Sequence, residues 1–254
     1  MYYIIVFIFG SIWGSFGNVC IHRIPINASI IKGRSHCPSC KIKISWFDNI
    51  PLLSFIILKA KCRNCLTQIS SKYFLVELIS ALSFVLIFHL YGFSLTTLLF
   101  FVLSISFIII FFIDLKHFII PNELTYSLMI IGFIKSFHPD LSFNFFPNFL
   151  DSLIGGVFGF TIIWLIIFIY KKFRNKEGMG LGDAKLLSAI GFWFGWFSIP
   201  FIIFFSSAVA LLSVVPDLVK NKKDLSSQIP FGPYIIIGNI IFLVFFDQIK
   251  IYLN

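Results

Sequence analysis

The sequence predicts an all-α polytopic membrane protein with about eight transmembrane helices and one small cysteine-rich module. Hydrophobic residues make up 58% of the 254 residues and charged residues only 12%, against about 25% charged residues in a soluble domain. So little charge cannot coat a water-facing surface, which excludes a soluble enzyme, a disordered chain and a fibrous repeat. Eight spans of about 20 residues need about 160 residues, and the remainder suffices for one small module.

The apolar runs place the spans in order along the chain. They cover about residues 2–19, 73–91, 95–113, 124–137, 149–170, 184–197, 199–216 and 231–249. The first run has no basic residue before Arg23, so we expect a retained span rather than a cleaved signal peptide. Helices approach each other closely in lipid through small and polar residues, and this run carries Ser11, Gly14, Ser15, Gly17 and Asn18.

Polar, glycine and proline residues separate the later runs. Gly92 marks a break between the second and third spans, and Pro139 and Pro147 lie in the loop between the fourth and fifth. The chain therefore divides into a first transmembrane helix, a polar module and a seven-helix membrane domain, at residues 1–19, 20–72 and 73–254.

The basic residues orient the spans. All but two of the 20 Lys and Arg residues fall in the segments 20–72, 114–123, 171–185 and 217–230. Alternating eight spans puts these segments on one side, which the positive-inside rule assigns to the cytoplasm. We therefore expect both termini outside, and Lys135 and Lys250, the two exceptions, to snorkel from span ends. This placement indicates a lipid bilayer with anionic headgroups as the partner, not nucleic acid.

Two Cys-x-x-Cys pairs, Cys37 with Cys40 and Cys62 with Cys65, lie in the polar module. Both sulfurs of such a turn can point at one metal, and the doubled motif is typical of a tetrahedral zinc site. Two disulfides or reduced structural thiols are the alternatives, although a cytoplasmic location argues against disulfides. Four protein ligands leave no open position, so the zinc would be structural and would staple the small module. We expect Cys20 to be an ordinary small apolar residue.

Asp114 closes an apolar run of about 19 residues. An ionisable group at such a depth is costly and is therefore a functional candidate. The alternative is an interfacial carboxylate paired with Lys116. We interpret His117 as an ordinary interfacial histidine.

Gly178, Gly180 and Gly182 precede Asp183 at the start of the sixth span. Glycines let the backbone approach another segment closely, and a carboxylate near a helix N-terminus is favoured in its ionised form. The alternative is a flexible loop with an N-cap aspartate. No Gly-Lys-Ser/Thr follows, so we expect no nucleotide site. Topology puts Asp114 and Asp183 at the same cytoplasmic edge.

Two carboxyl groups at one edge can form a dyad. They would share one proton, so that one is a general base toward water while the other polarises a carbonyl. This is aspartic peptidase chemistry. A proton- or cation-coupled transporter would also use intramembrane acids, but near the midplane and within an inverted repeat. A zinc-stapled scaffold without chemistry is the third possibility, and the residues alone leave all three open.

Together the motifs resemble those of the type IV prepilin peptidase family, the bifunctional prepilin leader peptidases and N-methyltransferases. The similar segments are Gly14–Val19, Arg23–Pro25, Arg34–Cys40, Trp46, Asn49–Pro51, Ser54, Lys61–Cys65, Tyr73, Glu77, Asp114–His117, Ile120–Asn122, Gly180–Lys185 and Ile229–Pro233. They span nearly the whole chain.

The resemblance implies that Asp114 and Asp183 are the catalytic aspartates and that residues 73–254 form the peptidase domain. It implies cleavage of a short basic leader from pilin or pseudopilin precursors at the cytoplasmic face of the bacterial inner membrane. Family members that lack the cysteine module keep only the peptidase; this chain has the module, so the resemblance also implies N-methylation of the new N-terminus from S-adenosylmethionine. No Gly-rich fingerprint marks a methyl-donor site, so no residue is assigned to it.

Overall fold

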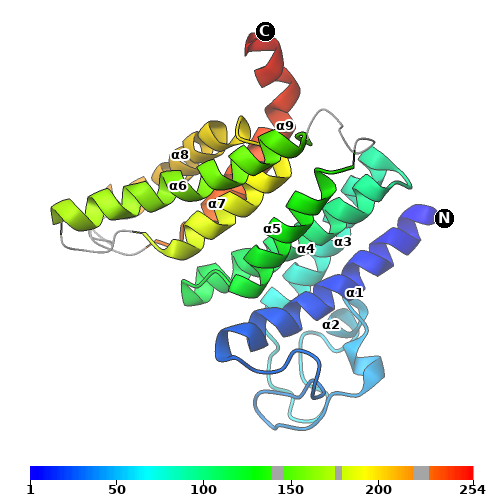
Figure 1. The fold of residues 1–254 in the computed structure, drawn as a ribbon. Coiled ribbons are helices and arrows are strands. Elements are labelled where there is room, and N and C mark those ends of the chain that lie inside the picture. The colour runs from blue at the N-terminus through cyan, green and yellow to red at the C-terminus, as the bar shows by residue number, and fades with distance from the viewer. Residues whose placement is uncertain (139–145, 175–178, 220–228, 254) are drawn as a thin grey trace. The chain divides into compact units, whose positions relative to one another are not determined.

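The computed structural model describes residues 1–138, 146–174, 179–219 and 229–253, in two compact units, Met1–Ile109 and Ile110–Asn254 (Figure 1). Parts of the predicted segments 138–148, 171–185 and 217–230 lie outside the described residues. Five helices among the described residues are long and apolar enough to cross a membrane: Tyr2–Ile26, Ser71–Tyr91, Leu95–His117, Phe149–Phe173 and Ser198–Val215. The all-helical multi-pass fold is confirmed, and the total of about eight spans stays a prediction.

Helices and short helical turns make up the first unit. They are α1 (Tyr2–Arg23), η1 (Ile24–Ile26), η2 (Trp46–Asn49), α2 (Leu53–Ile57), α3 (Ser71–Tyr91) and the first part of α4 (Leu95–His117). The segment between α1 and α3 is the cysteine module. Arg23, at the end of α1, donates to the carbonyl groups of Ser29, Lys32 and Gly33 at 2.8–3.1 Å. These three bonds fix the path by which the chain leaves α1.

Helices α1 and α3 pack antiparallel. The Tyr3 hydroxyl lies 3.2 Å from a His89 ring nitrogen at one end, and the Asn18 side-chain amide donates to the Tyr73 carbonyl at 3.0 Å at the other. A Cβ atom on Gly14 would lie 2.7 Å from a Cα atom of α3. The small residues of the first span therefore allow the close helix approach that the sequence predicts, since only glycine permits this distance.

The second unit is built around α7. Its helices are the end of α4, α5 (Asn122–Lys135), α6 (Phe149–Arg174), α7 (Leu181–Phe194), α8 (Ser198–Val219) and α9 (Gly232–Leu253). Nearly every residue of α7 from Asp183 to Phe194 is buried. Helices α5 and α6 both pack against it, and α6 and α7 run side by side (Figure 1).

Glycines bring α6 and α7 into backbone contact. A Cβ atom on Gly155 would lie 2.5 Å from the carbonyl oxygen of Gly191. Beside this contact the Ser188 hydroxyl donates to the Gly156 carbonyl at 2.7 Å. Close backbones and interhelical hydrogen bonds are the main sources of helix association in lipid, so α7 is held firmly against its neighbour.

Lys135 corrects a prediction. The side chain does not snorkel but is buried, with 5% of its surface exposed. Its ammonium group donates to the Trp193 carbonyl at 2.8 Å and lies 3.9 Å from the centre of the Phe146 ring. The last turn of α7 leaves carbonyl groups without partners, and these attract a cation. The Lys250 side chain lies outside the described residues.

Candidate active site and metal centre

Asp114 lies in the last turn of α4 and is 4% exposed. Its Oδ2 atom accepts a hydrogen bond from the backbone N–H of Gly232 at 3.0 Å. Gly232 is the first residue of α9, where the backbone N–H has no partner within the helix and the helix dipole favours a negative charge. The partner of Asp114 is thus a helix N-terminus rather than Lys116.

Asp183 lies in the first turn of α7 and is 7% exposed. Its backbone N–H donates to the Gly180 carbonyl at 3.2 Å, and its carboxyl group interacts electrostatically with that of Asp114. Within the described ranges, neither carboxyl group forms an ion pair with a Lys or Arg side chain. The structure therefore places the two predicted site residues within electrostatic reach of each other, on the ends of two different helices.

Ile120 packs against the first turns of α7 and α9, which lie beside the two acids. A Cβ atom on Gly182 would lie 3.0 Å from the Ile120 Cβ, and one on Gly232 would lie 3.0 Å from the Ile120 Cδ1. Glycine at both positions admits this side chain, which is 9% exposed. Three segments far apart in the sequence consequently meet beside the two aspartates.

Lys185 ties the start of α7 to the start of α5. Its ammonium group donates to the Asn122 Oδ1 atom at 2.8 Å and lies 5.2 Å from the centre of the Tyr126 ring. The contact fixes the helical turn that carries Asp183. Lys185, Asn122 and Gly232 all lie in the motifs quoted above, but their partners could not be predicted, since Gly232 and Asp114 are 118 residues apart.

The four module cysteines converge. The sulfur atoms of Cys37, Cys40, Cys62 and Cys65 all lie within 4.8 Å of one another, and those of Cys37 and Cys65 are 3.7 Å apart. All four are free thiols, so the disulfide alternative is not what the structure shows. Cys20 is 3% exposed and is not among the four clustered sulfurs.

The two Cys-x-x-Cys turns repeat one local geometry. The N–H of Cys37 donates to the Ile42 carbonyl and the N–H of Lys41 to the Cys37 carbonyl, at 3.0 and 2.9 Å. In the second turn the N–H of Cys62 donates to the Thr67 carbonyl and the N–H of Leu66 to the Cys62 carbonyl, at 2.9 and 3.0 Å. Lys41 and Leu66 occupy equivalent places with positive φ angles of 58° and 57°. Two equivalent knuckles facing each other fit one tetrahedral metal ion.

Side chains around the cluster support this geometry. Hydrogen bonds from Thr67 lower the pKa of the Cys65 thiol to about 6, which favours the thiolate that a metal needs. Arg63, between the second pair of cysteines, forms a forked ion pair with Asp48 whose shortest N···O distance is 2.6 Å. Hydrogen bonding to that guanidinium group holds the pKa of Asp48 below its usual range.

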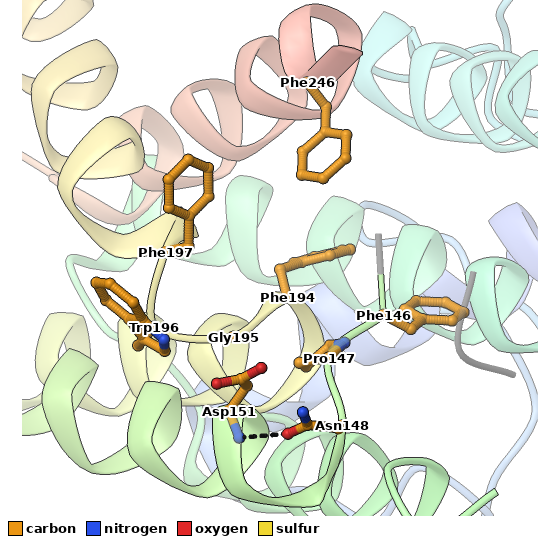
Figure 2. A pocket seen from close by; sticks show the side chains of 9 residues that line it. All are labelled: Phe146, Pro147, Asn148, Asp151, Phe194, Gly195, Trp196, Phe197 and Phe246. Carbon is orange, nitrogen blue, oxygen red and sulfur yellow. Dashed lines mark hydrogen bonds between the residues drawn. The ribbon is translucent and has the colours of Figure 1, made fainter. Parts of the chain in front are cut away.

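A cavity of about 230 Å³ opens at the opposite end of α7 from Asp183 (Figure 2). Asp151 lies beside it, and its backbone N–H donates to the Asn148 Oδ1 atom at 2.8 Å. Helix α7 has 14 residues and is therefore about 20 Å long. The cavity is lined by Phe146, Pro147, Asn148, Asp151, Phe194, Gly195, Trp196, Phe197 and Phe246. It is separate from the two aspartates.

Comparison with known proteins places the chain in one family. Residues 8–91 match the profile described as bacterial peptidase A24 N-terminal domain, and residues 100–215 match the type IV leader peptidase family. No solved structure matches.

Relatives cover nearly the full length. A prepilin leader peptidase/N-methyltransferase of Vibrio cholerae is 38% identical over 259 residues, which cover 97% of each chain. Proteins with the same name from Aeromonas salmonicida and Pseudomonas aeruginosa are 34% and 33% identical over 98% and 94% of this chain, and over 92% and 89% of their own lengths. The predicted family is confirmed: this chain belongs to the type IV leader peptidase family.

Proposed function

We propose that this chain cleaves the short basic leader from pilin or pseudopilin precursors and then N-methylates the new N-terminal residue. The observation that carries the proposal is the meeting of Asp114 and Asp183, two buried acids from different helices, without a neutralising cation among the described residues. A transporter would need its acids near the midplane of the membrane, whereas these lie at helix ends. A scaffold would need neither acid.

The geometry suggests different roles for the two acids. Both acids lie beside a helix N-terminus, Asp183 at that of α7 and Asp114 at that of α9. Asp114 accepts a hydrogen bond of 3.0 Å from the Gly232 N–H, and we assign the charged form, and with it the role of general base, to Asp114. It takes a proton from water as the water oxygen attacks the carbonyl carbon of the scissile bond. Asp183 holds the shared proton and donates a hydrogen bond to the carbonyl oxygen, where negative charge develops. Asp114 then gives the proton that it took from water to the leaving amine, the C–N bond breaks, and both acids return to their starting states.

The membrane positions the substrate in this proposal. A pilin precursor has a charged leader followed by an apolar helix, which can lie in the bilayer beside the spans. The charge distribution supports cleavage at the cytoplasmic face of the bacterial inner membrane, with both termini of this chain outside. Anionic lipid headgroups balance the basic segments, and nucleic acid has no part in the proposal.

Zinc and S-adenosylmethionine are the cofactors that we propose. Cys37, Cys40, Cys62 and Cys65 would hold one zinc ion, which would be structural because four thiolates complete its coordination. The methyl donor rests on the names of the relatives, which include N-methyltransferase.

Mass spectrometry of a pilin N-terminus tests the proposal directly. Membranes containing this protein are mixed with a candidate precursor, with and without S-adenosylmethionine. We expect the leader to be lost in both samples and the new N-terminus to gain one methyl group only with the donor. An intact precursor, across several pilins and pseudopilins, would contradict the peptidase assignment.

The purified protein is expected to contain one zinc ion per chain. Cys40→Ser or Cys62→Ser should remove nearly all of it, unfold the module, and affect methylation at least as much as cleavage. Cys20→Ser is the matched control and should keep its zinc, because Cys20 lies outside the cluster. Metal analysis and thiol alkylation check this; absence of zinc together with four freely alkylated thiols would contradict it.

Cysteine labelling in intact cells is expected to report the proposed sidedness. In a Cys20→Ala background, His138→Cys should react with a membrane-impermeant reagent and Lys172→Cys should not, although both positions are exposed. The reverse pattern would invert the proposed topology. Permeabilised cells, in which both should react, are the control for reactivity.

A further inference from the structure

Another acid of the membrane helices, Glu77, takes no part in the proposed peptide cleavage. It lies in the second turn of α3, and its Oε2 atom accepts a hydrogen bond from the backbone N–H of Leu52 at 2.8 Å. The side chains of Ser15 and Asn18 on α1 also interact with its carboxyl group. Ser15, Asn18 and Glu77 belong to motifs quoted above that the proposed cleavage does not use, and the first unit brings them together.

The surroundings hold this carboxyl group in a fixed place. Leu52 has a φ angle of 62°, a left-handed conformation that is unfavourable for a residue with a side chain and that the bond to Glu77 helps to retain. The Asn18 amide is fixed by the Tyr73 carbonyl one turn away on α3. A Cβ atom on Gly14 would lie 2.7 Å from the Glu77 Cα, so α1 approaches closest where the acid lies.

Glu77 is surrounded by neutral donors only. Over the described part of the chain it forms no ion pair with a Lys or Arg side chain. It is half-buried in a membrane span, where an unpaired charge is costly. Because the residue is only half-buried, a ligand can reach it, and a cation with N–H donors would form charge-assisted hydrogen bonds with this carboxylate.

We infer that Glu77, with Ser15 and Asn18, binds the α-ammonium group that leader cleavage exposes on the mature pilin. The inference rests on the proposed function, because cleavage is what creates this group: the uncleaved precursor has a neutral amide there. An ammonium group has three N–H donors, which the carboxylate and the Asn18 side-chain oxygen can accept. The apolar pilin helix in the bilayer would carry its N-terminus to the depth of the first turns of α3.

The same carboxylate has a role in methyl transfer. Glu77 takes one proton from the bound ammonium group, and the freed electron pair on nitrogen forms the new C–N bond. The C–S bond of a sulfonium methyl donor breaks at the same time, and its electrons stay on sulfur. The products are a methylated ammonium group, protonated Glu77 and a neutral thioether, so charge and atoms balance.

Binding of two peptides to the full-length protein in detergent tests the inference without a methyl donor. Both carry the N-terminal sequence of a mature pilin, one with a free amine and one N-acetylated. Wild type is expected to bind the free amine at least 10-fold more tightly. Glu77→Gln keeps the oxygen that accepts from Leu52 but loses the charge, and should bind both peptides alike. Asp183→Asn should still discriminate, which separates this site from the peptidase.

Activity gives an independent measurement. Glu77→Gln should lower methyl transfer onto a mature pilin by at least about 100-fold, the scale of general base catalysis, with zinc content and precursor cleavage unchanged; Glu123→Gln is the control. Equal binding of the two peptides by wild type overturns the inference, as does normal methylation by Glu77→Gln. Loss of cleavage in Glu77→Gln would instead make Glu77 a binding site for the basic leader. If the wild-type protein itself does not methylate, the N-methylation part of the proposed function fails. The comparison of the two peptides still decides whether Glu77 binds the ammonium group.

Discussion

Asp114→Asn and Asp183→Asn are each expected to lower the rate of leader cleavage by about 10²–10⁴-fold, the usual contribution of general acid–base catalysis. Asparagine keeps the size of the side chain and most of its hydrogen bonds, but it removes the base or the shared proton. The double variant should be little worse than either single one, because residues that act as a unit have non-additive effects. Conversion of a full-length precursor, followed by mass spectrometry, measures this.

Two other acids are the matched controls for this experiment. Glu123 is exposed on α5, and Asp151 lies beside the separate cavity at the far end of α7. Glu123→Gln and Asp151→Asn should leave substantial cleavage. Methyl transfer onto an already cleaved pilin should survive in both site variants, since that reaction needs neither aspartate. Near-normal cleavage by Asp183→Asn would show that the mechanism is wrong.

Gly232→Ala is expected to reduce cleavage by about 10²-fold, the loss that follows a displacement of about 1 Å in a catalytic group. The new methyl group would lie 2.7 Å from the Asp114 Oδ2 atom and 3.0 Å from the Ile120 Cδ1. Either the carboxyl group moves or α9 retreats, and both lengthen the hydrogen bond from the Gly232 N–H. The measurement is the rate of precursor cleavage at saturating substrate.

Gly17→Ala is the matched control, because the added methyl group would meet side-chain atoms at 3.4–3.8 Å, which is ordinary contact. It should leave cleavage nearly unchanged. A thermal unfolding measurement on both variants separates a displaced aspartate from a destabilised membrane domain. Wild-type cleavage by Gly232→Ala would mean that the hydrogen bond to Asp114 does not orient the base.

The sequence could single out the two acids and the four clustered cysteines because each is marked locally. Asp114 ends an apolar run, Asp183 follows a glycine series, and doubled Cys-x-x-Cys pairs have few other uses. The burial of Lys135 could not be predicted, because its partner is a carbonyl group on α7, 58 residues further along the chain. The role of Gly232 could not be predicted either, since a backbone donor leaves no mark in side-chain chemistry. The division at residues 19 and 72 stays a prediction.

Helix α9, which supplies the N–H group to Asp114, lies beyond the part of the chain that a truncated protein would keep. The matched leader peptidase profile ends at residue 215, whereas the donor belongs to Gly232 at the start of α9. A protein trimmed to the profile boundary would retain both aspartates yet lose the group that orients one of them. If the proposed mechanism holds, a minimal protease derived from this chain must therefore include the start of α9, and an inhibitor aimed at Asp114 has to compete with a main-chain donor.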